Sequence, residues 1–198
     1  MRRKQHIYYN RKESGIGMEK REFKRTIKTL EEHRKQLLME IDCIDHLLQA
    51  GSLINYDFMI DFAIKKGFKR VVDIGCAYGH QSELCRGRIE YVGIDEDLVV
   101  FYNVYEYNIY YPNKYPFFTN GLFWNDLAIC NLSIGWNCYD NEKEAKENFK
   151  ALSEDFKACL LYLPTDRENL LRECFKKVEV YKKSESKIVP TAFYYCHN

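Results

Sequence analysis

The clearest hydrophobic pattern of the chain lies near its amino terminus. Positions 23, 27, 30, 34, 37, 41, 44 and 48 follow one another at alternating steps of four and three, and all but Arg34 are apolar. A heptad stripe of this kind predicts a helix of about 30 residues. Leu38 and Leu47 widen the stripe, so it suits packing on a domain at least as well as pairing of two helices. We therefore expect a long helix over residues 19–52. A homodimer or a partner protein bound through residues 19–50 is a hypothesis.

A different pattern, in which strand-like runs alternate with helical stretches, continues through residues 53–198. Strands are expected at 70–74, 90–95, 115–119, 126–131, 158–163, 175–182 and 190–196, and helices near 80–86, 97–109, 141–156 and 166–174. This alternation predicts a parallel sheet with helices on both faces. The turn before the last strand is too short for a crossover helix, so that strand should be antiparallel. The predicted fold class is α/β: a doubly wound, seven-stranded, mostly parallel sheet with an antiparallel last strand, preceded by the long helix.

Composition supports one globular domain. The 198 residues include 46% hydrophobic residues, enough for one core. Neither a membrane span nor a secretory signal is evident, which predicts a cytoplasmic protein without membrane contact. The eight cysteines form no C-x-x-C pair, and several lie in apolar runs. We therefore expect reduced structural thiols and no metal site.

Charge is unevenly distributed although the net value is only +1. Residues 1–35 hold twelve Lys or Arg against five Asp or Glu. Residues 1–18 also lack an apolar period, which predicts a disordered basic arm. Such an arm either attracts nucleic acid or an acidic partner, or is a solvated tail. The lack of a recognised motif in the arm favours the tail.

The most informative segment is VVDIGCAYGH, at residues 71–80, followed by YVGIDED at 91–97. A strand here enters a tight loop of small residues, where the backbone can approach a ligand closely. A second strand ends at Asp95, twenty residues beyond Gly75. In such folds a carboxylate at this place accepts hydrogen bonds from the hydroxyls of a ribose. These features together indicate an adenosine-containing ligand at the carboxyl edge of the sheet.

The order of the small residues distinguishes between cofactors. The run Asp73-x-Gly75-x-Ala77-x-Gly79 is neither the G-x-G-x-x-G of dinucleotide sites nor a P-loop. It resembles the first motif of class I S-adenosylmethionine-dependent methyltransferases, (D/E)-x-G-x-G-x-G, with Ala77 in place of the middle glycine. The resemblance covers residues 53–198. It includes the segment 125–136, which looks like the strand that ends beside the methionine part of the cofactor.

This resemblance implies roles for individual residues. Asp73 and the backbone of the loop would hold the amino-acid end of the cofactor, the carboxylates after the second strand the ribose, and the turn at 120–121 the adenine. Asn131 would lie near the methyl group and the nucleophile. Asn120 is equally well explained as an ordinary turn residue. The implied cofactor-binding residues are Asp73, Gly75, Cys76, Ala77, Gly79, Asp95, Glu96, Asn120, Gly121 and Asn131.

The substrate is not marked in the sequence. After the fourth predicted strand the chain reads NLSIGW, without the N/D-P-P-Y/F of amino-directed nucleic-acid methyltransferases. The Pro-Cys and Lys-Asp-Lys-Glu patterns of other nucleic-acid enzymes are also missing. We expect a methyltransferase that converts S-adenosylmethionine to S-adenosylhomocysteine on a small molecule, a protein or RNA. Two alternatives remain: a non-catalytic cofactor-binding module that works with a partner, and a cofactor-degrading enzyme.

Overall fold

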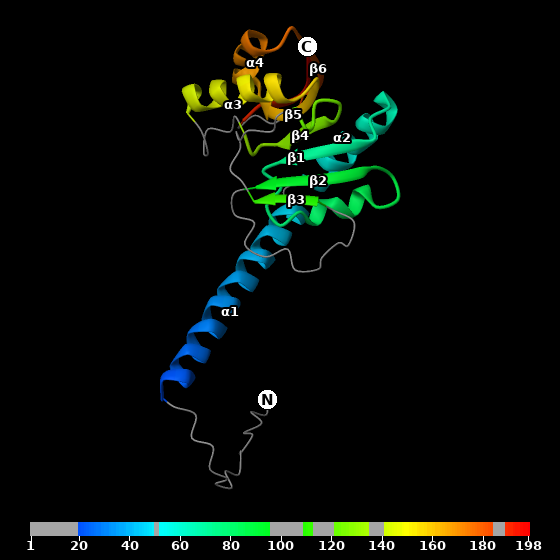
Figure 1. The fold of residues 1–198 in the computed structure, drawn as a ribbon. Coiled ribbons are helices and arrows are strands. Elements are labelled where there is room, and N and C mark those ends of the chain that lie inside the picture. Colours follow the sequence, from blue (N-terminus) through cyan, green and yellow to red (C-terminus); the bar gives the residue numbers. More distant parts are fainter. Residues whose placement is uncertain (1–19, 50–51, 96–108, 113–120, 135–140, 184–188) are drawn as a thin grey trace, which may run out of the picture. The chain divides into compact units, whose positions relative to one another are not determined.

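The computed structural model describes residues 20–49, 52–95, 109–112, 121–134, 141–183 and 189–198 (Figure 1). The chain divides into two compact units, Met1–Met39 and Glu40–Asn198. Helix α1, Lys20–Gln49, includes residues of both units, whereas every strand belongs to the second unit. The predicted basic arm, residues 1–18, lies outside the described residues.

The second unit is built on a mixed sheet with the strand order β3-β2-β1-β4-β5-β7-β6. The first five strands pair in parallel: β1 (Arg70–Ile74), β2 (Glu90–Asp95), β3 (Ile109–Pro112), β4 (Leu127–Asn131) and β5 (Ala158–Pro164). The last strand, β7 (Thr191–His197), lies antiparallel between β5 and β6 (Lys177–Lys183). The prediction of a mixed α/β sheet with an antiparallel last strand is confirmed.

Strand β3 covers residues for which the sequence predicts no strand. Ile109 is expected to end a helix, but Ile109–Pro112 forms β3 and pairs in parallel with residues 92–95 of β2. The predicted strand at 115–119 and the rest of the predicted helix, 97–108, lie outside the described residues. An isoleucine followed by two tyrosines has high strand propensity. At Ile109 this propensity prevails over the helical spacing that predicted a helix end there.

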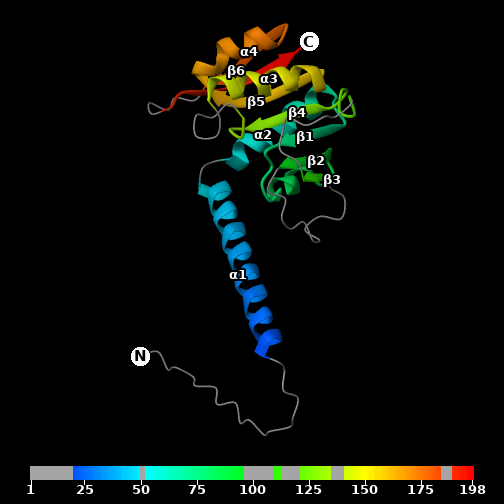
Figure 2. The same ribbon diagram turned by 60° about the vertical axis from the view of Figure 1, so that its left-hand side comes forward.

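Helices cover both faces of the sheet, as Figures 1 and 2 show. α2 (Ser52–Lys66) packs on one face, and α3 (Glu142–Asp155) and α4 (Glu168–Cys174) pack on the other. Successive strand residues point to opposite faces. Val71 accordingly joins the core cluster of α2, whereas Val72 joins the cluster of α3 and α4, and both are fully buried. The three layers hold the central strands, and hence their carboxyl ends, in fixed positions.

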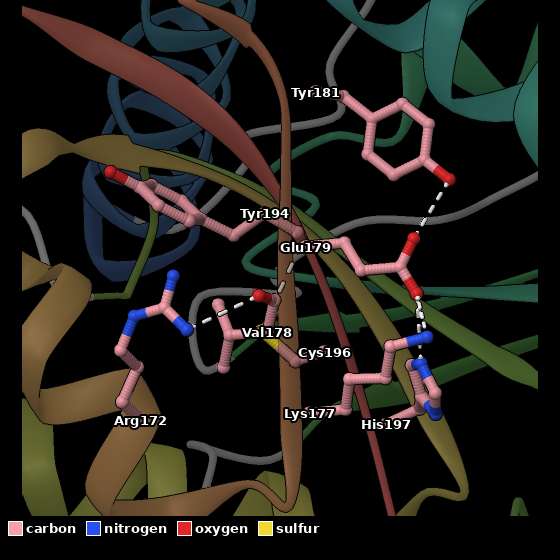
Figure 3. A network of polar contacts seen from close by, with 8 residues as sticks. All are labelled: Arg172, Lys177, Val178, Glu179, Tyr181, Tyr194, Cys196 and His197. Carbon is pink, nitrogen blue, oxygen red and sulfur yellow. Dashed lines mark hydrogen bonds and ion pairs between the residues drawn. The ribbon is translucent and has the colours of Figure 1, made fainter.

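A polar network occupies the edge strand β6 (Figure 3). Glu179 lies 2.7 Å from Nζ of Lys177, accepts a hydrogen bond from the hydroxyl of Tyr181 at 3.3 Å, and lies 3.2 Å from Nε2 of His197 on β7. Hydrogen bonding to Lys177, and next to His197, lowers the pKa of Glu179 to about 2. Charged groups on an edge strand oppose pairing with a second sheet. β6 is the outermost strand on its side of the sheet. We therefore assign this network to the protection of that edge against pairing with another sheet.

Six cysteines in the described ranges are free thiols in the structure. Cys76, Cys85, Cys130, Cys159 and Cys196 are buried free thiols, and Cys174 is partly exposed. Within the described ranges no three His, Cys, Asp or Glu residues are placed to hold a metal ion. No helix in the same ranges combines the length and the apolar character that a membrane span requires.

Candidate functional site

The candidate site lies where β1, β2 and β4 end. These three strands are neighbours and run in parallel, so Ile74, Asp95 and Asn131 end at one edge of the sheet. From β1 the chain builds the sheet outward through β2 and β3 on one side and through β4 and β5 on the other. This reversal of strand order is the switch point at which open α/β sheets bind ligands. The predicted site residues Asp95 and Asn131 therefore lie at the carboxyl edge of the sheet, as expected.

The loop after β1 has an unusual backbone. Gly75, Ala77 and Gly79 all have positive φ angles, of 75°, 48° and 69°. Glycine adopts such angles without strain, whereas alanine does so rarely and at a cost. Ala77 is supported because its amide donates a hydrogen bond to Oδ2 of Asp95 at 2.8 Å. The loop from the first strand and the carboxylate from the second are therefore joined in one structure.

Gly75 is required by close packing as well as by its backbone angle. A Cβ atom at this position would lie 2.1 Å from Cβ and 2.4 Å from Oγ of Ser133. The hydroxyl of Ser133 also donates to the carbonyl oxygen of Gly75 at 2.9 Å. Ser133, in the loop after β4, thus packs directly on the start of the glycine loop. The sequence does not predict this contact, because nothing in the NLSIG segment indicates which residue Ser133 touches.

Asp73 lies beneath the loop and is fully buried. Its Oδ2 accepts hydrogen bonds from Nε2 of Gln81 at 2.6 Å and from the hydroxyl of Tyr91 at 2.7 Å. Its Oδ1 accepts a longer bond, of 3.4 Å, from the hydroxyl of Tyr56. Nε2 of Gln81 also donates to the carbonyl oxygen of Cys76 at 2.9 Å. The carboxylate of Asp73 is therefore linked through Gln81 to the loop backbone.

The electrostatics of this cluster follow from its burial. Burial raises the pKa of Asp73 to about 6, although the hydrogen bonds from Gln81, Tyr91 and Tyr56 lower it. The pKa values of Tyr56 and Tyr91 are raised well above 10, by burial first and by the charge of Asp73 second. Both tyrosines therefore stay protonated and act as donors. A buried carboxylate needs such partners, because an unpaired one would be strongly destabilising.

Asn131 ends β4 with its side chain half-buried. Its Oδ1 accepts a hydrogen bond from Nδ2 of Asn55 at 3.2 Å. Asn55 lies in the first turn of α2, 76 residues earlier in the chain. The bond orients the Asn131 amide at the edge of the sheet beside the glycine loop. Asn55 carries no recognisable sequence signal, because one asparagine in an amphipathic helix is unremarkable.

The structure brings some predicted site residues together and leaves others apart. Gly75, Ala77, Gly79, Asp95 and Asn131 meet at the carboxyl edge, while Asp73 and Cys76 lie buried beneath it. Contact of Asp73 with a cofactor stays a prediction, and its buried geometry favours support of the loop. Glu96 and Asn120 lie outside the described residues.

The resemblance assigns Gly121 to the turn that would hold the adenine. The strand expected at 115–119, just before this turn, lies outside the described residues. Gly121 starts the turns that lead into the amino end of β4, and Trp124 N donates to its carbonyl oxygen at 3.2 Å. The adenine contact at Gly121 stays a prediction.

The loop after β1 also leads into a different element from the one expected. It enters a 3₁₀ helix of six residues, His80–Cys85, with Gly79 as its first flanking residue. A helix this short contributes little dipole. The remaining donors at this edge are the backbone amides and side chains described above.

A shallow hollow of about 470 Å³ lies at the opposite edge of the sheet. Lys66, Lys69, Lys157 and the carboxyl-terminal residues line it, near the amino ends of β1, β4 and β5. Ligands of open α/β sheets bind outside the carboxyl ends of the strands. Its lysines are surface side chains, and we assign the candidate site to the carboxyl edge.

Comparison with known proteins identifies the fold. No protein-family model matches the chain, and neither does any curated protein sequence. Solved structures do match. The N-methyltransferase NodS of Bradyrhizobium japonicum WM9, bound to S-adenosylhomocysteine, matches with a TM-score of 0.55 and 10% identity over 73% of this chain and 85% of its own. The magnesium protoporphyrin IX methyltransferase of Synechocystis PCC 6803, bound to S-adenosylmethionine, matches with a TM-score of 0.53 and 13% identity over 76% of this chain and 82% of its own.

A third match is the N-terminal domain of EvdMO1, bound to S-adenosylhomocysteine. It has a TM-score of 0.53 and 11% identity, over 72% of this chain and 80% of its own. Identities this low establish the architecture and not the substrate. Together with the mixed sheet and the position of the glycine loop, these matches show that the chain has the fold of the class I S-adenosylmethionine-dependent methyltransferases.

Proposed function

We propose that this protein is an S-adenosylmethionine-dependent methyltransferase whose cofactor binds at the carboxyl ends of β1, β2 and β4. The observation that carries the proposal is the hydrogen bond of 2.8 Å between the Ala77 amide and Asp95. It joins the glycine loop to a carboxylate at the end of the neighbouring strand. The class I methyltransferase fold supports the same function.

The residues present fit this cofactor. Asp95 is half-exposed and Ala77 is exposed at the loop surface, so both can be reached from outside. In the proposed complex Asp95 accepts hydrogen bonds from the ribose, and the backbone from Gly75 to Ala77 holds the amino-acid end. Asn131, oriented by Asn55 through the 3.2 Å bond, lies nearest the reacting groups. Asp73 acts as a positioning residue for the loop.

The chemistry explains why few catalytic side chains are needed. S-adenosylmethionine supplies an activated methyl group on a sulfonium ion. The protein then has to align a nucleophile with that group and exclude water. The substrate is a small molecule, a protein or RNA, and the described site carries no group that selects one of the three.

Calorimetric titration with S-adenosylmethionine and S-adenosylhomocysteine, with NAD as a control, tests the proposal. We expect binding of the first two at about micromolar concentrations and none of NAD. Absence of binding would refute the cofactor assignment. Binding without release of S-adenosylhomocysteine in the presence of candidate substrates of all three kinds would favour a non-catalytic module. Release without any substrate, together with cofactor breakdown, would favour a degrading enzyme.

A matched pair of variants locates the site. Asp95→Asn keeps an oxygen that can accept from Ala77 but removes the charge. Glu90→Gln makes the same change at the other end of the same strand, where the side chain is exposed. We expect Asp95→Asn to weaken binding of S-adenosylhomocysteine and Glu90→Gln to leave it unchanged. Equal affinities of the two variants would place the ribose away from β2.

A further inference from the structure

Helix α1 presents apolar side chains to solvent in a regular pattern. Four members of the heptad stripe are exposed: Leu30 at 62%, Leu37 at 49%, Ile41 at 52% and Leu48 at 64%. Isolated exposed leucines are common on protein surfaces, but a contiguous stripe indicates an interaction site. The four residues, which we call the α1 stripe, lie at heptad spacing along about 27 Å of helix, at 1.5 Å per residue.

Contacts within the second unit leave part of the α1 stripe uncovered. Oε1 of Glu40, on α1, lies 3.2 Å from Nε2 of His80. Glu40 and Ile44 are only half-exposed, whereas Ile41 and Leu48, on an adjoining side of the same helix, remain exposed. Within the second unit, Ile41 and Leu48 are therefore left for a partner to cover.

The charges along α1 indicate what that occupant is. Residues 20–29 contain five Lys or Arg and one Glu, whereas residues 40–49 contain three Asp or Glu and no Lys or Arg. Residues 30–39 are balanced, with two residues of each sign. The helix is therefore basic in its first third and acidic in its last third. A partner of complementary charge must carry the opposite order, and a second copy of α1 running antiparallel has that order.

The apolar pattern is self-complementary in the same orientation. An antiparallel pair sets position 23 against 48, 27 against 44, 30 against 41 and 34 against 37 of the second copy, so that every stripe position is used. Arg34 then faces Leu37. A parallel, in-register pair would instead set Arg34 against Arg34 and place like-charged thirds together, which is unfavourable. Antiparallel pairing also has the two-fold symmetry typical of homodimers.

We propose that the protein forms a homodimer through antiparallel pairing of α1, with the α1 stripe at its centre. This pairing is independent of the methyltransferase assignment. A cofactor-binding result of either sign leaves it unchanged.

Sedimentation equilibrium of the full-length chain over about 1–100 μM tests the proposal. We expect a monomer–dimer equilibrium. Leu37→Gln should raise the dissociation constant by about 30-fold, because each dimer loses two buried leucines. Met39→Gln is the matched control, since Met39 is similarly exposed, at 45%, but lies off the stripe. It should change the constant by less than about twofold. Circular dichroism checks that both variants keep their helix content.

Salt distinguishes the two orientations. Antiparallel pairs attract through their end charges, so raising the salt from about 0.05 to 0.5 M should weaken the dimer. A dimer that salt strengthens would contradict the antiparallel arrangement. A monomer at every concentration, or a dimer that Leu37→Gln does not weaken, would overturn the proposal as a whole.

Discussion

Replacement of Gly75 by alanine tests the packing at the centre of the candidate site. Two costs add at this position. The backbone angle, φ of 75°, costs an alanine about 1–2 kcal/mol, less about 0.4–1 kcal/mol for the more restricted unfolded chain. The new Cβ would lie 2.1 Å from Cβ of Ser133, where carbon atoms normally stay about 3.5–4.0 Å apart. Ser133 must therefore move by more than an ångström.

The second cost is estimated from similar overpacked sites. Forcing a methyl group into a packed place costs about 1–3 kcal/mol. Displacement of Ser133 also breaks its hydrogen bond to the Gly75 carbonyl oxygen, which contributes about 0.5–1.5 kcal/mol. We therefore expect Gly75→Ala to lower the free energy of unfolding by about 2–5 kcal/mol, a large part of the stability of an ordinary domain.

Gly67 provides the matched control. Its φ is 85°, but a Cβ there would meet no atom within 4 Å. Gly67→Ala therefore has only the backbone cost and should lose about 1 kcal/mol. Urea unfolding followed by circular dichroism gives both values, with the slope of the transition as a check on two-state behaviour. Adding Ser133→Gly to Gly75→Ala should restore most of the stability lost to the clash and none of the stability lost to the backbone angle.

Two results would refute this reasoning. If Gly75→Ala and Gly67→Ala lose equal stability, Ser133 does not pack on the glycine loop. If Gly75→Ala loses more but Ser133→Gly restores nothing, the clash is with another group. The double-mutant cycle measures the interaction between positions 75 and 133 directly.

Three further predictions concern the same site. Asp95→Ala should weaken cofactor binding by about 1–3 kcal/mol in calorimetry, through loss of charge-assisted hydrogen bonds and of the acceptor for the Ala77 amide; unchanged affinity would move the ribose elsewhere. Asp73 has a folded-state pKa of about 6, above its ordinary 3.8, so the folded protein takes up this proton before the unfolded chain as the pH falls. Its contribution to stability therefore rises by about 1 kcal/mol between pH 7 and pH 5, and Asp73→Asn should lack that rise in urea titrations at the two pH values; equal pH dependence would show that Asp73 ionises normally. Deletion of residues 1–18 should leave cofactor affinity unchanged in the same calorimetry, and a large loss would show that the arm contributes to the pocket.

The sequence alone predicted the strand, the tight loop and the carboxylate of the site, because these features depend on local residue pattern. A β-branched strand that ends in small residues predicts a tight loop, and the spacing to Asp95 places a carboxylate at the end of the neighbouring strand. Both features depend on residue type and period. The apolar stripe of α1 can be predicted for the same reason, since heptad spacing depends only on the sequence of that segment.

The state of Ile109 was predicted wrongly, because the sequence ends a helix there and the structure begins β3 there. Residues 109–112 are β-prone, but the aromatic residues before them follow a helical period, and the two signals conflict. Which one prevails depends on pairing with β2, a contact between segments far apart along the chain.

Only the tertiary structure decided how the site is held together. The sequence shows Asp73 as an acid before a glycine loop, and the fold buries it among Tyr56, Gln81 and Tyr91 and makes it an anchor. Contacts of this kind join residues from separate elements, as do Ser133 on Gly75 and Asn55 on Asn131, across 58 and 76 residues. Local pattern determines which segments become strands and loops. The packing of three layers determines which side chains meet, because that depends on the whole chain at once.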